Sequence, residues 1–278
     1  MNFKKTKLKN GLTVITVAIS NNPTITCMVT VHTGSKYETK EQNGLSHFLE
    51  HMCFKGTVKR PKSIDVAIEL DSIGSQYNAF TSQEFTSYYA KSHPSHLDKI
   101  LDVVSDMYLN PVFDDGEIEK EKGVIVEEIN MYDDMPNMRV WNLLMEGMDG
   151  DQPAGWDVLG PKENSKKFTR EDFIEYRKQH YVAGATTVVV VGDFVESDLI
   201  KKIEELFTGI STSSKKDKLA IVEKQESPMI KLKTKETDQT HILIGLRTFD
   251  SKDPRNSALK FLNSVLGGGI SGRLWQKL

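Results

Sequence analysis

The segment that most constrains the fold is residues 186–192, TTVVVVG, which contain four successive valines. β-Branched residues favour the extended conformation, and a short apolar run with no polar face is typical of a fully buried strand. A buried strand must pair its backbone N–H and C=O groups with other strands. The chain is therefore expected to fold around a sheet.

Further strand-like segments come in two pairs. Residues 11–19 and 25–33 are rich in β-branched residues and are separated by an Asn-Asn-Pro turn, which predicts a hairpin. Residues 75–80 and 85–91 are expected to form another antiparallel pair, since the second alternates apolar and polar side chains.

Helices are predicted where apolar residues recur at helical spacing between capping residues. One of them begins at Asp114-Asp115, whose negative charges suit the positive N-terminal end of a helix. The predicted helices are residues 45–54, 63–73, 95–109, 115–132, 138–147, 170–178, 196–207 and 256–266, with another beginning near Ser271. Strands and helices together indicate an α+β protein.

A polar, lysine-rich segment at 211–218, STSSKKDK, has no periodicity and is the best candidate for a linker. Beyond it the pattern begins again, with strand-like segments at 228–235 and 241–248 before the helix at 256–266. A segment of about sixty residues buries too little apolar surface to make a complete domain. We therefore expect an α+β domain over residues 1–212 and the incomplete start of a second, similar domain over 213–278.

The composition is that of an ordinary globular protein. Of 278 residues, 38% are hydrophobic and 27% are charged, and the net charge of −3 gives no strong field to attract nucleic acid or a membrane surface. No apolar run approaches the roughly 18–20 residues that a membrane span needs. Asn10-Gly11 interrupts the N-terminal stretch, which predicts a strand instead of a signal peptide and hence a cytoplasmic protein. The two cysteines, Cys27 and Cys53, cannot build a disulfide framework.

The segment NGLSHFLEHMCFKG places an HxxEH motif on the helix predicted at 45–54. His47 and His51 are four residues apart, so they project from one face, where both imidazoles can reach one metal ion. Glu50 lies on the same face one position earlier than His51, so its carboxylate can approach a water molecule activated by the metal.

Two histidines on a helix can also be packing residues with a chance carboxylate nearby. A third ligand separates these interpretations, because catalytic zinc generally has three protein ligands. Glu128 lies in GVIVEEI, an otherwise apolar part of a predicted helix, where a carboxylate needs a cation or a metal as partner. Glu121 is seven residues earlier and shares its face, whereas Glu127 is expected to face solvent.

The run GLSHFLEHMCFKGT, followed by EKGVIVEEI, resembles the pitrilysin/insulinase family of inverzincin metallopeptidases. It is most similar to the small bacterial homologues of the mitochondrial processing peptidase beta subunit. Residues 75–92, 168–181 and 188–194 also resemble family segments, so the similarity covers essentially the whole chain. Cys53 departs from the pattern, since a larger aliphatic residue is common there.

The resemblance implies a zinc-dependent metalloendopeptidase with one Zn²⁺ per chain. His47, His51 and Glu128 would be the zinc ligands, and Glu50 the general base. Glu121 would orient a ligand histidine from behind. The implied fold is a two-layer α/β sandwich with a mainly antiparallel sheet and helices on one face.

The resemblance also implies how a peptide binds. Family members hold it as an added strand at a sheet edge, within a chamber closed by two halves. Asn78 and Ala79 would place an amide near the substrate backbone, although an asparagine at 78 that caps a turn fits equally well. Unfolded peptides or short polypeptides are then the expected substrates, and a homodimer or a complementary half-chain is the expected assembly.

Two other functions remain compatible with the sequence. Family relatives that have lost the site serve as structural subunits, but here His47, Glu50, His51 and Glu128 are all present. A zinc-binding protein without activity could keep the ligands, but it would have no need of Glu50. The remaining histidines lack partners at ligand spacing and are expected to be structural: His32, His93, His96, His180 and His241.

Overall fold

The computed structural model describes residues 2–223, 225–236 and 238–277. The chain divides into two compact units, Met1–His241 and Ile242–Leu278. In the described part of the chain, no helix is both long enough and apolar enough to cross a membrane.

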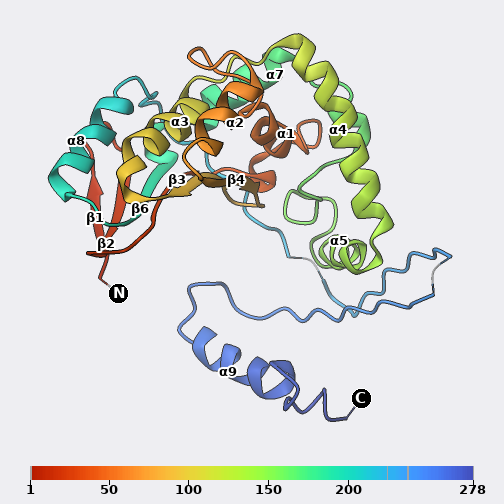
Figure 1. Cartoon of the computed structure of the whole chain (residues 1–278). Coiled ribbons are helices and arrows are strands. Elements are labelled where there is room, and N and C mark those ends of the chain that lie inside the picture. The colour runs from red at the N-terminus through yellow and green to blue at the C-terminus, as the bar shows by residue number, and fades with distance from the viewer. Residues whose placement is uncertain (1, 224, 237, 278) are drawn as a thin grey trace. The chain divides into compact units, whose positions relative to one another are not determined.

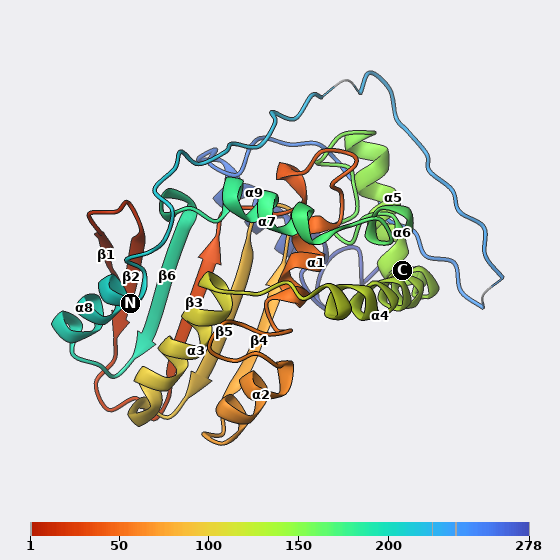
Figure 2. The ribbon, with the colours of Figure 1, turned by 90° about the horizontal axis from the view of Figure 1, so that it is seen from above.

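The first unit is built on one six-stranded sheet (Figure 2). Its order is β1-β2-β6-β3-β5-β4. β6 runs parallel to β2, and every other neighbouring pair is antiparallel. The strands are β1 (Lys4–Lys7), β2 (Thr13–Ala18), β3 (Ile25–Val31), β4 (Gln76–Thr81), β5 (Thr86–Ser92) and β6 (Thr186–Gly192). The α+β class and the mainly antiparallel sheet are confirmed.

The hairpin expected from residues 11–19 and 25–33 is wrong. Both segments are strands, but β6 lies between them and pairs with each, Val14 with Val188 and Val29 with Val188. The four valines predicted a buried strand, and this position in the sheet leaves Val188 and Val190 fully buried. The hairpin at this end joins β1 and β2 around Asn10-Gly11, where Gly11 adopts a φ of 96°.

Helices cover one face of the sheet, as Figures 1 and 2 show. The strands reflect this arrangement, because alternate residues of β3 and β6 are buried and the intervening ones are half-buried. The helices of this unit are α1 (Leu45–Met52), α2 (Ser63–Asp71), α3 (Leu97–Leu109), α4 (Asp115–Asp134), α5 (Pro136–Asp149), α6 (Lys162–Ser165), α7 (Arg170–His180) and α8 (Glu196–Leu206). All except the short α6 were predicted.

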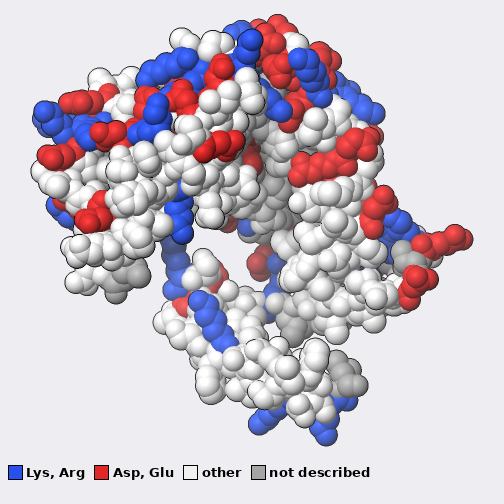
Figure 3. Space-filling model, viewed as in Figure 1, with Lys and Arg blue, Asp and Glu red and all other residues white. Residues whose placement is uncertain are grey.

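Charged side chains of both signs are interspersed over the helical layer on the face shown in Figure 3. This mixture agrees with the small net charge of −3. The HxxEH motif lies beneath this layer, on the buried helix α1, which packs against β4, β5 and α4. Within that core Phe48 contacts Phe173 edge to face, with 5.0 Å between the ring centroids.

The second unit contains α9 (Asn256–Gly267), which confirms the helix predicted at 256–266. The strand expected at 228–235, in the first unit, and the one expected at 241–248 are not formed, and residues 271–277 make turns instead of a helix. Alternation alone does not make a strand, because the backbone needs a partner strand, and Ile244 and Leu246 are more than 80% exposed. The domain boundary after residue 212 stays a prediction.

Candidate metal centre

The loop that precedes α1 determines where this helix begins. The buried carboxylate of Glu38 accepts hydrogen bonds from the backbone N–H groups of Gly44 at 2.9 Å and Ser46 at 2.6 Å. It also accepts one from the side-chain amide of Asn43. A carboxylate at this end satisfies N–H groups that have no partner inside the helix and complements its positive end. Glu38 therefore fixes where the motif helix starts.

Gly44, the residue before α1, could not be replaced without strain. Its φ is 101°, a conformation that side chains disfavour. A Cβ atom added there would lie 2.4 Å from the carbonyl oxygen of Leu159. The helix start is thus packed directly against the loop that precedes α6.

The three expected metal ligands come together from two helices. His47 and His51 project from α1, and Glu128 reaches them from α4. Oε2 of Glu128 lies 3.7 Å from Nε2 of His47 and 3.4 Å from Nε2 of His51. One ligand atom from each residue lies within 4.8 Å of the other two.

This arrangement fits a tetrahedral zinc ion. With ligands about 2.1 Å from zinc, neighbouring ligand atoms would be roughly 3.4 Å apart. The distances of 3.4 and 3.7 Å between the glutamate and the histidines are close to that value. Two imidazoles and one carboxylate are also a donor set found in catalytic zinc sites, which keep a fourth position open.

Glu121 lies behind the ligand His51. Its Oε1 is 2.9 Å from Nδ1 of His51, and its Oε2 is 2.6 Å from Nζ of Lys55. Burial raises the pKa of Glu121, but the two hydrogen bonds outweigh burial and hold its pKa below the usual value. An ionised Glu121 accepts the Nδ1 proton of His51, which leaves Nε2 free to bind a metal.

The two histidines differ in their surroundings. Burial, followed by the neighbouring His51, lowers the pKa of His47 to about 3, so its imidazole is neutral. Burial also lowers the pKa of His51, but the nearby carboxylates of Glu121, Glu128 and Glu50 outweigh it and raise that pKa above the usual value. A metal cation at this place would replace the proton that these carboxylates attract to His51.

Glu50 projects from α1 beside the two histidines and is 8% exposed. Thr81, the last residue of β4, donates a hydrogen bond of 2.5 Å to Oε2 of Glu50. Burial raises the pKa of Glu50 more than this hydrogen bond lowers it. A raised pKa makes the carboxylate a stronger base, which suits a group that accepts a proton during catalysis.

Asn78 and Ala79 both lie on β4, the strand at the end of the sheet nearest to α1. The side-chain oxygen of Asn78 accepts the backbone N–H of Ala79 at 2.9 Å. This N–H is thus bonded within the chain, and Asn78 lies inside the strand, opposite Tyr89 of β5, and not in a turn. A contact of either residue with substrate stays a prediction.

Three residues around the site were missed in the sequence: Glu38, Lys55 and Thr81. Glu38 and Thr81 lie outside the motif, and only the folded chain brings them to α1. Lys55 is four residues after His51, a spacing that would place both side chains on one face of a helix. This spacing could have indicated that Lys55 lies near the site. Cys53 is buried and free, and burial raises the pKa of its thiol to about 11, which disfavours the reactive thiolate.

Two protein-family models match the chain. The family described as "Insulinase (Peptidase family M16)" matches residues 13–162, and the one described as "Peptidase M16 inactive domain" matches residues 167–278. The candidate ligands His47, His51 and Glu128 all lie in the first match.

Several bacterial proteins are similar in sequence. The "uncharacterized zinc protease YmxG" of Bacillus subtilis is 38% identical, over 99% of this chain and 66% of its own length. An "uncharacterized zinc protease" of Rickettsia felis is 34% identical, over the whole chain and 66% of its own length. The chain thus spans 66% of the length of these curated relatives.

Solved structures share the fold. A protease from Helicobacter pylori superposes with a TM-score of 0.82 at 23% identity, over all of this chain and 68% of that protein. A "peptidase M16 inactive domain" structure from Pseudomonas fluorescens gives a TM-score of 0.82 at 17% identity, over 99% of this chain and 67% of that protein. The family match over residues 13–162, more than half of the chain, shows that the chain belongs to the insulinase family, peptidase family M16.

Proposed function

We propose that this chain is the metal-binding part of a zinc-dependent metalloendopeptidase that hydrolyses unfolded peptides or short polypeptides. The observation that carries the proposal is the convergence of His47, His51 and Glu128, with Glu50 beside them. The names of the relatives, zinc proteases, support it.

Each residue has a distinct role in this proposal. His47, His51 and Glu128 would hold one Zn²⁺, which would supply Lewis acidity at the scissile bond. Glu50 is placed to accept a proton from the attacking water and to pass it to the leaving amine. Thr81 holds the carboxylate of Glu50 in place, and Glu121 holds the imidazole of His51.

The edge of β4 is the proposed peptide site. β4 is the terminal strand of the sheet, and its last residue, Thr81, contacts Glu50. A peptide added as a strand there would therefore run past the general base. Recognition through backbone hydrogen bonds favours unfolded peptides, because the strands of a folded protein are already paired.

A complementary half-chain or a second copy would close the site. This part of the proposal is supported by the solved structures, since this chain covers about two thirds of the protease from Helicobacter pylori. A cytoplasmic location also belongs to the proposal.

The decisive experiment measures zinc content and peptide hydrolysis separately. Zinc is quantified by mass spectrometry, and cleavage of a quenched fluorescent peptide is followed for the chain alone and with a complementary half-chain added. Glu50→Gln should keep its zinc and lose about 10²- to 10⁴-fold in rate. Glu127→Gln is the matched control, since Glu127 bonds Asn130 on the exposed side of α4 and should leave the rate unchanged.

The alternative function gives a different result. A non-catalytic structural or zinc-binding subunit would bind zinc without cleavage that depends on Glu50, even with the second half present. That outcome would reject the peptidase and leave the metal site intact.

A further inference from the structure

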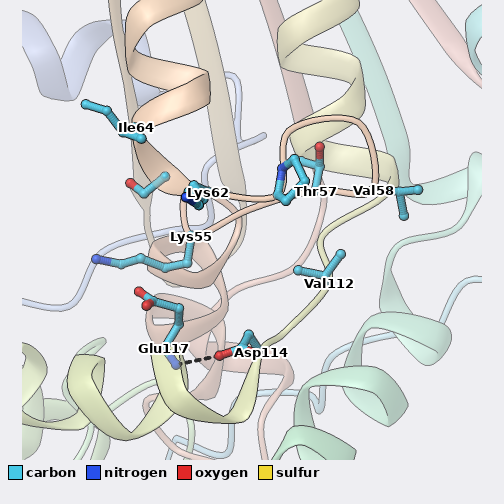
Figure 4. A pocket seen from close by; sticks show the side chains of 10 residues that line it. Lys55, Thr57, Val58, Lys62, Ile64, Val112, Asp114 and Glu117 are labelled. Carbon is cyan, nitrogen blue, oxygen red and sulfur yellow. Dashed lines mark hydrogen bonds between the residues drawn. The ribbon is translucent and has the colours of Figure 1, made fainter.

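Lys55 lies in the turn that follows α1, and its backbone N–H bonds the carbonyl oxygen of Met52. Its side chain lines a surface pocket of about 750 Å³ together with residues of α2 and of the first turn of α4 (Figure 4). Figure 4 shows the amine end of Lys55 pointing away from Val58 and Val112 on the other side of this pocket. The amine lies 2.6 Å from Oε2 of Glu121.

Acidic groups closer to the pocket are already engaged. Asp114 accepts the backbone N–H of Glu117 at 3.0 Å, as the cap of α4. The carboxylate of Glu117 pairs with Lys120 at 2.6 Å. The charge of Lys55 is thus directed to Glu121, inside the metal centre.

Glu121 needs two donors to be held in one orientation. It is 3% exposed, and a buried carboxylate is costly unless it is paired and hydrogen-bonded. Its two oxygens are used separately, Oε1 by His51 and Oε2 by Lys55. With Lys55 in place, a partial turn of the carboxylate would break the ion pair, whereas a half-turn would only exchange its two equivalent oxygens.

The orientation of Glu121 sets that of His51. A hydrogen bond to Nδ1 fixes the ring so that Nε2, 3.4 Å from Oε2 of Glu128, faces the metal position. We propose that Lys55 is a positioning residue of the zinc centre, which acts through Glu121 to present Nε2 of His51 to the metal. The inference rests on the zinc site of the proposed function, but it does not depend on peptide hydrolysis.

The test measures zinc affinity of the full chain by competition with a chromophoric chelator, without any peptide. Lys55→Met keeps the apolar stem and removes the charge, and it should weaken zinc binding about 10-fold, as partners behind a metal ligand do. Lys59→Met is the matched control, because Lys59 pairs with Asp102 at 2.7 Å and is 56% exposed. Its zinc affinity should equal that of the unmodified chain.

Two further variants separate positioning from a general effect on the fold. Lys55→Arg keeps a charged donor and should restore most of the affinity. In the Glu121→Gln background, Lys55→Met should cost little more, since its target is already altered.

The outcomes are distinguishable from those of the proposed function. If the unmodified chain binds no zinc, the proposed function fails. If it binds zinc but Lys55→Met matches Lys59→Met, or if Lys55→Met costs the same with and without Glu121, the role of Lys55 is overturned and the peptidase proposal stands.

Discussion

The two helices that carry the candidate metal ligands are held in the protein in opposite ways. In α1 every residue is buried except His51, so the helix is surrounded by core on nearly all sides. In α4, twenty residues long, the buried residues are Ile118, Glu121 and Ile125. One helix is fixed by packing, and the other is attached along a single stripe.

This difference means that the histidines and Glu128 are held in place by different amounts of packing. Ile118, Glu121 and Ile125 recur at helical spacing, and Glu128 continues the same stripe by three residues. The third ligand is therefore at the end of the attached part of α4, while the histidines lie on a helix that the core holds in place. We infer that a bound metal adds to the attachment of α4 far more than to that of α1.

The largest expected effect is the loss of core packing at α1. Phe48 is fully buried and packs against Phe168 and Phe173. Phe48→Ala should lower the free energy of unfolding by about 3–5 kcal/mol, because it removes apolar contacts and leaves a cavity. Val124→Ala on α4, where the side chain is 49% exposed, should change it by less than about 0.5 kcal/mol. Urea denaturation of both variants measures the contrast, and similar losses would contradict it.

Zinc removal should affect the two helices unequally. At a zinc concentration 1,000 times Kd, a ligand that binds only the folded state stabilises it by about 4 kcal/mol. We expect hydrogen exchange to slow on zinc binding mainly in α4, around Glu128, and little in α1. Mass spectrometry of peptides from the two helices, with and without a chelator, measures this difference. Equal protection in both would show that packing holds them alike.

Acid should lower the free energy of unfolding by protonating His180, which packs beside a contact of α1. This imidazole packs on Tyr176, whose hydroxyl is hydrogen-bonded to Ser46 of α1. Burial, followed by the charge of Lys216, lowers the pKa of His180 from 6.5 to about 4. Protonation therefore favours the unfolded chain, so this stability is complete above pH 6.5 and is lost as the pH falls toward 4.

The shift of this pKa from 6.5 to about 4 corresponds to a loss of about 3 kcal/mol in the free energy of unfolding. The unfolding free energy of His180→Gln should fall less steeply than that of the unmodified chain between pH 6.5 and 4. Denaturation curves at several pH values test this, with His93→Gln as control, because His93 is an exposed cap of Ser95. Parallel curves for His180→Gln and the unmodified chain would show that this histidine titrates normally.

The smallest expected effect on stability concerns the buried residues of α4. Ile125 is fully buried, and Ile125→Val removes one methylene group, which should cost about 0.5–1.5 kcal/mol. It should also speed hydrogen exchange in α4 and leave α1 unchanged. Equally faster hydrogen exchange in both helices would mean that they unfold together.

The sequence predicted the parts of this site that local spacing determines. A spacing of four residues places His47 and His51 on a common face of any helix, and a spacing of seven does the same for Glu121 and Glu128. It did not predict Thr81, because the contact with Glu50 depends on how β4 packs against α1. It also gave β2 the wrong neighbour, since alternation identifies a strand but not its partner. The unpaired segments at 228–235 and 241–248 show the same limit.

The position of β6 has a consequence for how the chain is made. Thr13 pairs with Thr187 and Thr26 with Val191, so the two halves of the sheet are joined by its last strand. Synthesis at about 5–20 residues per second separates β2 from its partner by roughly 10–35 s. During that time the edges of β2 and β3 are unpaired on the ribosome, where they can join other chains. A nascent chain that ends before Thr186 contains the whole HxxEH sequence and lacks the strand that completes its support.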